Sequence, residues 1–247
     1  MKKYLSIVLA VLIIIITIVY SVKQSTPDFE QYAAGKARKT AFFSYFLPLI
    51  AAKNQEIALT REKLHHWRDN SSDIGWWDAR QLDDLASQYR VKEFTIDDNA
   101  SWDKLLLKVD VLPPSLVLAQ AANESAWGTS RFATLGNNYF GQWCYKKGCG
   151  LVPKQRDTGK AHEVAAFDSP QESLNSYMQN LNSHPAYKPL RKIRDQCHRN
   201  NQDITGIALA VGLTSYSERG AQYIKELQEM INFNGLSKYD EYINNQD

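Results

Sequence analysis

A long apolar run near the amino terminus constrains this chain more than any other feature of its sequence. The run extends from Leu5 to Tyr20, is interrupted only by Ser6 and Thr17, and follows Lys2 and Lys3. About 20 apolar residues span the hydrocarbon core of a bilayer, whereas the apolar part of a cleaved signal peptide has roughly 7 to 15. The run therefore predicts a membrane-inserting segment over residues 1–22, either an anchor or a signal peptide.

An uncleaved anchor is the interpretation that we favour, because no Ala-x-Ala follows the run and Val19 with Ser21 forms only a weak cleavage site. The lysines stay on the cytoplasmic side, so everything after Val22 is exported. We expect a protein of the cell envelope, periplasmic or extracytoplasmic, held to the inner membrane by residues 5–22, or secreted if the signal is cleaved. The polar residues 23–36 predict a tether to the folded part.

Size and charge set further bounds. The chain has 247 residues, which is room for one ordinary domain and an appendage, and 44% of them are hydrophobic, enough to form a core. The formal net charge of +2 gives no support for nucleic acid as a partner. The composition indicates no oligomeric state.

Three cysteines lie in the exported part, where thiols oxidise and stay oxidised. Cys144 and Cys149 bracket a polar turn that contains Gly148, so we predict that they close a small disulfide loop and leave Cys197 unpaired. The alternative is three ordinary thiols.

A helical region precedes the part of the chain that carries the most informative motifs. Residues 36–68 have aromatic and aliphatic side chains at helical spacing, Pro48 is expected to kink or split that helix, and a second helix is predicted over Trp77–Tyr89. We interpret the polar span 92–101 as the boundary between this helical region and the domain that follows. We therefore divide the exported chain into an N-terminal helical region at 37–101, a catalytic domain at 102–236 and a C-terminal tail at 237–247.

Local signals in the second part predict helices and one small β-lobe. Pro113 and Pro114 begin a helix that Gly128 ends, and shorter helices are expected at 129–135, 203–211 and 218–231. Ser-Pro-Gln-Glu at 169–172 matches a capping box, followed by apolar residues at i, i+3, i+4 and i+7. Several glycines between residues 141 and 167 predict a hairpin or β-lobe, so the fold should be mainly α-helical.

Glu124 is the candidate catalytic acid. It lies one turn before the predicted helix end, with Trp127 and small apolar residues nearby. In such surroundings the charged form is disfavoured and the pKa rises toward neutrality, which suits an acid that protonates a glycosidic oxygen. The ordinary alternative, a solvated glutamate at a helix end, is the commoner one for a lone glutamate.

The segments around Glu124 supply amides and aromatic rings, the groups that bind sugars. Candidates for the substrate cleft are Trp127, Asn138, Tyr139, Phe140, Gly141, Tyr216 and Tyr223. For Tyr223 the alternative is a core position, because it shares a helix face with Leu227 and Met230.

Three motifs in order resemble a known family: Ala-Asn-Glu-Ser-Ala-Trp-Gly-Thr-Ser at 122–130, Asn-Asn-Tyr-Phe-Gly at 137–141, and Tyr216-Ser217 upstream of Tyr223. With the Cys-x4-Cys pair and Asn-Leu-Asn-Ser-His-Pro-Ala-Tyr at 180–187, the chain resembles the β-N-acetylglucosaminidase domain of bacterial cell-wall hydrolases, above all their exported Bax-type branch. The resemblance covers most of the chain from about Lys36 to the last helix.

The resemblance implies a lysozyme-like, mainly helical domain with a small β-lobe, and cleavage of the β-1,4 bond after N-acetylglucosamine in peptidoglycan glycan strands. It implies Glu124 as the general acid and Tyr216 as the tyrosine at the catalytic cleft. The spacing from Tyr216 to Tyr223 is slightly longer here than in other glucosaminidases, which leaves the individual role of each tyrosine open. No cofactor is expected.

A second carboxylate is harder to assign. Glycosidases pair the acid with a nucleophile about 5 to 5.5 Å away or with a base roughly 6.5 to 9.5 Å away. Glu163, in the predicted β-lobe, is the first candidate and Asp157 the second. A substrate-assisted route, in which the acetamido oxygen of the sugar attacks, needs no protein nucleophile.

Other chemistries find little support. His162-Glu163 begins like a zinc-protease motif, but Ala166 occupies the place of the second histidine, so no metal site is expected. No serine lies in a Gly-x-Ser-x-Gly elbow, and Cys197 lacks the local signature of a nucleophile. A basic cluster predicts a solvated helix face, with contact to a wall polymer as the alternative; its members are Lys188, Arg191, Lys192, Arg194 and Arg199.

Two alternative functions remain at this stage. A muramidase or lytic transglycosylase of the same superfamily would use the same glutamate on the neighbouring bond. A non-catalytic envelope protein would keep the cleft only to bind peptidoglycan.

Overall fold

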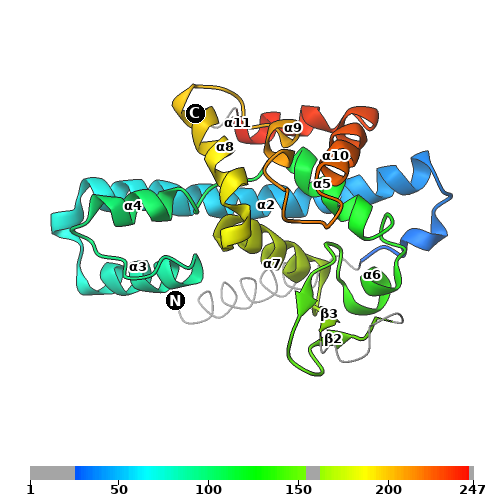
Figure 1. Ribbon diagram of the computed structural model, residues 1–247, viewed down its shortest axis with the longest axis horizontal. Helices are drawn as coiled ribbons and strands as arrows, with labels where there is room; N and C mark the ends of the chain where they lie inside the picture. Colours follow the sequence, from blue (N-terminus) through cyan, green and yellow to red (C-terminus); the bar gives the residue numbers. More distant parts are fainter. Residues whose placement is uncertain (1–25, 154–161, 245–247) are drawn as a thin grey trace, which may run out of the picture.

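The computed structural model describes residues 26–153 and 162–244, and it is mainly helical with one small sheet (Figure 1). The membrane segment predicted at 1–22 lies outside the described residues. Among the helices that are described, none combines the length and the hydropathy of a membrane span.

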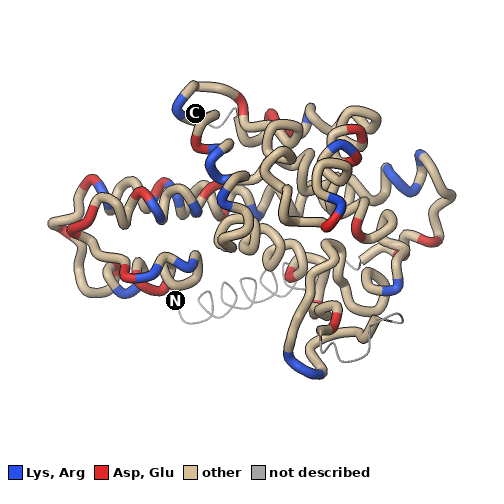
Figure 2. The backbone as a smooth tube through the Cα atoms, in the orientation of Figure 1, with Lys and Arg blue, Asp and Glu red and all other residues tan. Residues whose placement is uncertain are grey.

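The longest element is helix α2, Lys36–Asp69, which extends across the molecule (Figure 1). It passes through Pro48 as a single helix, so the prediction that this proline splits it is wrong. The amide missing at Pro48 would have bonded the carbonyl of Ser44, and both residues are exposed, so water can satisfy that carbonyl. Lys, Arg, Asp and Glu are interspersed along α2, consistent with a solvated outer side (Figure 2).

Helix α3, Trp76–Gln88, confirms the second predicted helix and lies beside the far end of α2 (Figure 1). The 3-10 turn η2, Ser71–Asp73, joins the two. Helix α4, Asn99–Leu106, begins inside the span that we interpreted as a boundary, where the Asp98 side chain accepts hydrogen bonds from the amides of Ala100 and Ser101. That capping carboxylate is why the helix starts there.

Helix α5, Pro114–Glu124, is the centre of the fold and begins at the predicted prolines. It packs against α2, α9 (Gly206–Ala210), α10 (Ala221–Phe233) and the 3-10 turn η4 (Leu236–Tyr239). Its amino end is fixed by Asp240, whose carboxylate accepts hydrogen bonds from the amide and hydroxyl of Ser115 and from the amide of Gly206. Residues 237–244, expected as a tail, are therefore packed, and they end in the short helix α11, Glu241–Asn244.

The predicted β-lobe is confirmed as a three-stranded antiparallel sheet. Strands β1 (Trp143–Cys144) and β2 (Gly150–Leu151) flank β3 (Glu163–Ala165), in the order β1-β3-β2. In register, Trp143 pairs with Val164 and Gly150 with Ala165. Helix α6, Arg131–Gly136, leads into this lobe from α5.

Helix α7, Pro170–Ser183, has the predicted capping box: the Ser169 hydroxyl accepts the Glu172 amide, and the Glu172 carboxylate accepts the amide of Asp168. The 3-10 turn η3 (Pro185–Tyr187) and helix α8 (Lys188–Arg199) follow. The prediction that α8 presents a fully solvated basic face is wrong for Arg191 and Arg194, which are 3% and 0% exposed.

Residues 26–35, predicted as part of a tether, are attached to the domain through Phe29, although most of them are exposed. They include the 3-10 turn η1, Phe29–Gln31, and Phe29 is 1% exposed against the rings of Phe42, Tyr45 and Tyr139. A Cβ atom at Gly128 would come within 2.2 Å of the Phe29 ring. One apolar core therefore joins residues on both sides of the boundary that we placed at 101/102. A lysozyme-like arrangement of these helices stays a prediction.

Candidate active site

Glu124 is the last residue of α5, and the helix that carries it is rigidly held. The small side chains of Ala121 and Ala122 let neighbouring helices approach closely, and both residues are 0% exposed. The hydroxyl of Ser125 donates to the Ala121 carbonyl and accepts the amide of Gly128 at 2.8 Å, so the helix ends in a fixed turn. The Glu124 carboxyl group therefore has a defined position at the border between the helices and the β-lobe.

The turn at Gly141 brings backbone against this carboxyl group. Gly141 has a φ of +61°, and a Cβ atom there would lie 3.1 Å from Oε2 of Glu124. Asn138 holds the turn: its Oδ1 accepts the amides of Phe140 (3.3 Å) and Gln142 (3.0 Å), and its Nδ2 donates to carbonyls of Gln142 (2.9 Å) and of β3 (2.8 Å). These bonds engage the whole amide, so Asn138 builds the turn and is not free to make the sugar contact expected of it.

A directional chain of hydrogen bonds ends on Glu124. The hydroxyl of Tyr177 donates to Oε1 of Gln120, Nε2 of Gln120 donates to the hydroxyl of Tyr223 (3.0 Å), and that hydroxyl donates to Oε1 of Glu124 (2.8 Å). Gln120 is 0% exposed and Tyr177 and Tyr223 are 1% exposed. The chain leaves Oε2, the oxygen beside Gly141, as the one available to a substrate.

Tyr216 supports this chain instead of ending on Glu124. Its ring stacks on that of Tyr223, with centroids 5.5 Å apart and planes 5° apart, and its hydroxyl donates to the carbonyl of Phe140 (2.8 Å). The tyrosine that contacts the acid is therefore Tyr223, and Tyr216 positions both Tyr223 and the turn at Gly141.

The environment raises the pKa of Glu124 above its ordinary value. Burial is the main cause, and hydrogen bonds from Tyr223 and Asn123 and the charge of Arg219 oppose it only in part. The position at the carboxyl end of α5 acts in the same direction, since helix carbonyls disfavour a negative charge there. A carboxyl group of this kind keeps its proton at higher pH than an exposed glutamate does.

Glu124 opens into a cleft with a volume of about 750 Å³. Of the side chains that we predicted for the site, Glu124, Phe140, Gly141 and Tyr216 line it. Further lining residues come from α3, the β-lobe, α7 and the loop before α10; they include Gln88, Arg90, Trp143, Tyr145, Asn180, His184 and Arg219.

Two predicted sugar contacts lie elsewhere. Trp127 packs edge-on against Phe43, with ring centroids 5.4 Å apart, and the Lys39 ammonium lies 4.8 Å from its ring centroid. Tyr139 is 2% exposed and meets Phe46 in the core at 4.8 Å. Both rings hold the Glu124 segment against α2, and neither lines the cleft.

Glu163 is placed inside the β-lobe, where its carboxylate accepts the amides of Gly148 (3.1 Å) and Gly150 (2.9 Å). It is 5% exposed and does not line the cleft that contains Glu124. The predicted disulfide is present between Cys144 and Cys149, whose Cα atoms are 6.2 Å apart. Glu163 and the two sulfurs lie within 4.8 Å of one another, but sulfurs bonded to each other do not coordinate a metal. Glu163 therefore holds the disulfide loop, and Asp157 lies outside the described residues.

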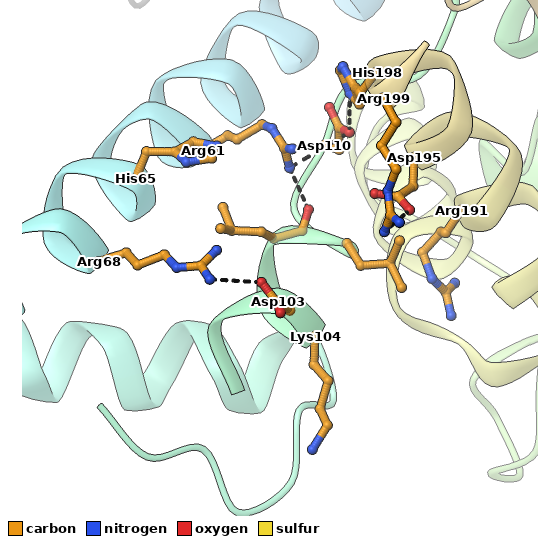
Figure 3. Close-up of a pocket in the computed structure, with 12 residues that line it drawn as sticks. Arg61, His65, Arg68, Asp103, Lys104, Asp110, Arg191, Asp195, His198 and Arg199 are labelled. Atoms are coloured by element: carbon orange, nitrogen blue, oxygen red, sulfur yellow. Dashed lines mark hydrogen bonds and ion pairs between the residues drawn. The ribbon is translucent and has the colours of Figure 1, made fainter. Parts of the chain in front are cut away.

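A second cavity, of about 390 Å³, lies where α2, α4 and α8 meet (Figure 3). Asp110 is its centre: the carboxylate pairs with Arg194 (3.2 Å), Arg61 (3.7 Å) and His198 (2.8 Å). Figure 3 shows the side chains of Arg61 and His198 pointing toward Asp110, with Arg68 and Asp103 forming a separate pair. Every carboxylate that lines this cavity is already paired, so we interpret it as a structural junction.

Sequence reasoning missed several cleft residues. Trp143 and Tyr145 are 51% and 81% exposed on either side of Cys144, and an aromatic pair in so polar a loop was a usable signal of a binding role. Arg90 had no such signal, because it reaches the cleft only through the packing of α3, whereas His184 lies in the motif at 180–187 but was given no role there.

Comparisons with known proteins identify the family. Residues 99–236 match the model of the glucosaminidase family, described as mannosyl-glycoprotein endo-beta-N-acetylglucosaminidase. The chain is 37% identical to Protein bax of Escherichia coli (strain K12) over 202 residues, which cover 81% of this chain and 70% of that protein. Among solved structures, the catalytic domain of the autolysin Auto from Listeria monocytogenes is similar with a TM-score of 0.45 and 19% identity, over 90% of this chain and 93% of that one.

Proposed function

Because the chain belongs to the glucosaminidase family, we propose that it hydrolyses the β-1,4 bond after N-acetylglucosamine in peptidoglycan, with Glu124 as general acid. The observation that supports this most directly is the state of Glu124. It is a largely buried carboxyl group with a raised pKa, it receives the Tyr223 hydroxyl on Oε1, and it faces a polar cleft. Membership of this family supports a glycoside hydrolase that acts in the cell envelope.

In the proposed reaction, the proton on Oε2 of Glu124 passes to the glycosidic oxygen as the bond from that oxygen to the anomeric carbon breaks. The Tyr223 hydroxyl stabilises the negative charge that Glu124 then carries, since a donor to a carboxylate favours the ionised form. Water adds to the anomeric carbon, and its proton returns to Glu124. The acid is thereby restored for the next cycle.

For attack on the anomeric carbon we propose the acetamido oxygen of the sugar itself. It bonds to that carbon as the glycosidic bond breaks, and this new bond breaks in turn when water adds to the same carbon. Glu163, the first candidate for a second carboxylate, uses both oxygens on the amides of Gly148 and Gly150. Asp157, outside the described residues, stays the candidate of a two-carboxylate route. Anchoring to the inner membrane by residues 5–22 is part of the proposal and follows from the sequence.

The deciding experiment is mass spectrometry of peptidoglycan digests. The native chain should release fragments with reducing N-acetylglucosamine ends; reducing or anhydro muramic acid would indicate a muramidase or a lytic transglycosylase. Glu124→Gln should lose roughly 10²- to 10⁴-fold in turnover, because it removes a positioned general acid. Glu56→Gln, on the exposed side of α2, is the matched control and should be fully active.

Two outcomes contradict the mechanism. Near-normal turnover by Glu124→Gln would remove Glu124 from the chemistry. Peptidoglycan binding by the native chain without any released fragment would identify a binding protein that is not an enzyme.

A further inference from the structure

One end of the cleft is built by residues that precede the segment matched by the family. Gln88 and Arg90, at the end of α3, line the same cleft as Glu124, whereas the family match begins at residue 99. The N-terminal helices therefore contribute a wall of the proposed active site as well as part of the core.

This wall is held in place by specific bonds. Nε2 of Gln179, on α7, donates to the carbonyl of Gln88 (2.9 Å), which ties the end of α3 to the cleft floor. The Lys108 ammonium donates to the carbonyls of Tyr89 and Arg90, each at 2.8 Å. Arg90 itself has a φ of +55°, a left-handed conformation that a residue with a side chain seldom adopts without such support.

The groups at this end are donors that the protein does not use. Within the described residues, no hydrogen bond or ion pair engages the exposed Arg90 guanidinium or the side-chain amide of Asn180. Nδ1 of His184 accepts the amide of Ala186 at 3.2 Å, so the ring carries its proton on Nε2. Burial, and then the charges of Arg90 and Arg191, lower the pKa of His184, which keeps the ring neutral and a donor.

As far as the structure describes it, the lining of this end of the cleft contains no acidic side chain beside these donors. Among the described residues that line the cleft, Glu124 is the only carboxylate, and its raised pKa keeps it protonated to higher pH. A cluster of a free guanidinium, an amide and an imidazole N–H is suited to an anionic oxygen ligand, and a planar carboxylate matches the guanidinium best.

We propose that Arg90, Asn180 and His184 form a subsite for a carboxylate on a peptide branch of the glycan, so that the enzyme selects strands that still carry their peptides. The inference rests on the proposed function, because the peptide branches of peptidoglycan are what would bring a carboxylate to this end of the cleft. Arg90 is a specificity-determining residue in this account and takes no part in the bond cleavage.

Equilibrium binding tests the subsite separately from the chemistry. The full chain carrying Glu124→Gln would be titrated with soluble peptide-bearing glycan and with the same glycan after its carboxylates have been converted to amides. We expect binding of the carboxylate form to be tighter by roughly tenfold, the low end for a charge-assisted hydrogen bond. Equal binding of the two forms would overturn the proposal without any further variant.

Variants then locate the effect. Arg90→Asn, a residue type that tolerates the left-handed backbone, should bind both forms equally, and Arg90→Lys should restore part of the difference. Arg80→Gln, on the exposed side of α3 and paired with Asp84, is the matched control and should behave as the parent. An Arg90→Asn protein that keeps the full preference would also overturn the proposal.

Turnover of peptide-bearing glycan by the chain with Glu124 intact separates this inference from the function on which it rests. If the chain cleaves the glycan but shows no preference for binding the carboxylate form, the proposed hydrolase activity is supported and the subsite is refuted. Arg90-dependent binding without cleavage by the native chain would leave the subsite standing and refute the hydrolase.

Discussion

The two oxygens of Glu124 have different surroundings, and three neighbouring side chains make them so. Oε1 receives the Tyr223 hydroxyl, and Tyr223 is in turn oriented by Gln120 and by the parallel ring of Tyr216. Oε2 lies beside Gly141, where any side chain would crowd it. A buried amide one turn before the acid thus decides which oxygen carries the proton to be transferred.

Gln120→Glu should shift the pH dependence of the enzyme. A carboxyl group at position 120 offers the Tyr223 hydroxyl a second acceptor in competition with Glu124, and in its ionised form it also disfavours ionisation of Glu124. Both effects raise the pKa of Glu124, so Glu124 stays protonated to higher pH. The alkaline limb of kcat/KM against pH should move upward by about one unit, measured on soluble glycan.

Asn54→Asp is the matched control for this change. Asn54 is a buried residue whose side-chain amide bonds to the backbone of Leu112. It is far in sequence from the hydrogen-bond chain that ends on Glu124, and it does not line the cleft. It should lower stability and leave the alkaline limb where it was. If the alkaline limb of kcat/KM against pH does not move in Gln120→Glu, the hydrogen-bond chain does not act on the pKa of Glu124.

At the scale of single residues, the sequence singled out Glu124 as the candidate acid but left open which tyrosine contacts it. Glu124 lies in a local motif together with the residues that end its helix, and a signal of this kind can be read from the sequence alone. Tyr216 and Tyr223 were both candidates, but which hydroxyl meets Glu124 depends on how α10 packs against α5. Asn138 was assigned to the sugar because free amides bind sugars, whereas the structure uses its amide to shape a turn.

At the scale of elements, the β-lobe depends on Glu163 and the disulfide together. The strands have only two or three residues each, too few to be stable alone. Glu163 bonds the two amides of the loop that the disulfide closes, so one buried carboxylate replaces the hydrogen bonds that a longer sheet would supply.

Glu163→Gln should therefore affect the lobe more than the chemistry. The side-chain amide keeps one acceptor and loses the other, so the amides of Gly148 and Gly150 should lose protection from hydrogen exchange. Turnover should fall by less than about tenfold, because substrate assistance needs no nucleophile from the protein. A loss of roughly 10²-fold or more, with protection unchanged, would instead return Glu163 to the role of second carboxylate.

The helices show which structural features can be predicted from sequence signals that lie within a few residues of one another. The proline start of α5 and the capping box of α7 were predicted because their signals lie within a few residues. Helix α4 was missed, since its span is polar and only the Asp98 cap reveals it. The burial of Arg194 was missed as well, because its counter-ion Asp110 is 84 residues away in the chain.

At the scale of the whole molecule, Asp110 joins α2 to α8, because its carboxylate pairs with Arg61 on α2 and with Arg194 on α8. Burial alone would raise the pKa of Asp110, but the charge of Arg194, the hydrogen bond from His198 and the charge of Arg61 lower it to about 2. A carboxylate whose pKa is lower in the folded than in the unfolded protein stabilises the fold at pH values above its unfolded pKa of about 3.9. That contribution should be lost progressively as the pH falls from about 4 to about 2.

Asp110→Asn should destabilise the protein by about 3–5 kcal/mol at neutral pH, because it leaves the buried Arg194 without a counter-ion. The loss of stability between about pH 4 and pH 2 should shrink in the variant, as followed by chemical denaturation. Asp103→Asn removes only the partly exposed pair with Arg68 and should cost at most about 1 kcal/mol. Equal effects of the two substitutions would show that Asp110 is not the centre of this junction.

Excision of the segment matched by the family should yield a chain that does not fold cooperatively. Residues 99–236 lack Phe29 and α2, whose rings complete the core around Tyr139, and they lack Asp240, which fixes the start of α5. Circular dichroism during thermal unfolding should show a broad, weak transition for 99–236 and a sharp one for 26–247. A sharp transition for the shorter segment would show that it is an independent domain.

The path of α2 has a practical consequence for engineering. Helix α2 packs against the Phe29 turn, supports the segment of Glu124 and leads to α3, so the cleft is hard to transplant to another protein. A chimera assembled at the boundary suggested by sequence similarity would inherit the acid but lose one wall of its cleft. Useful grafts should start before residue 29 and keep the acidic side chain at 240.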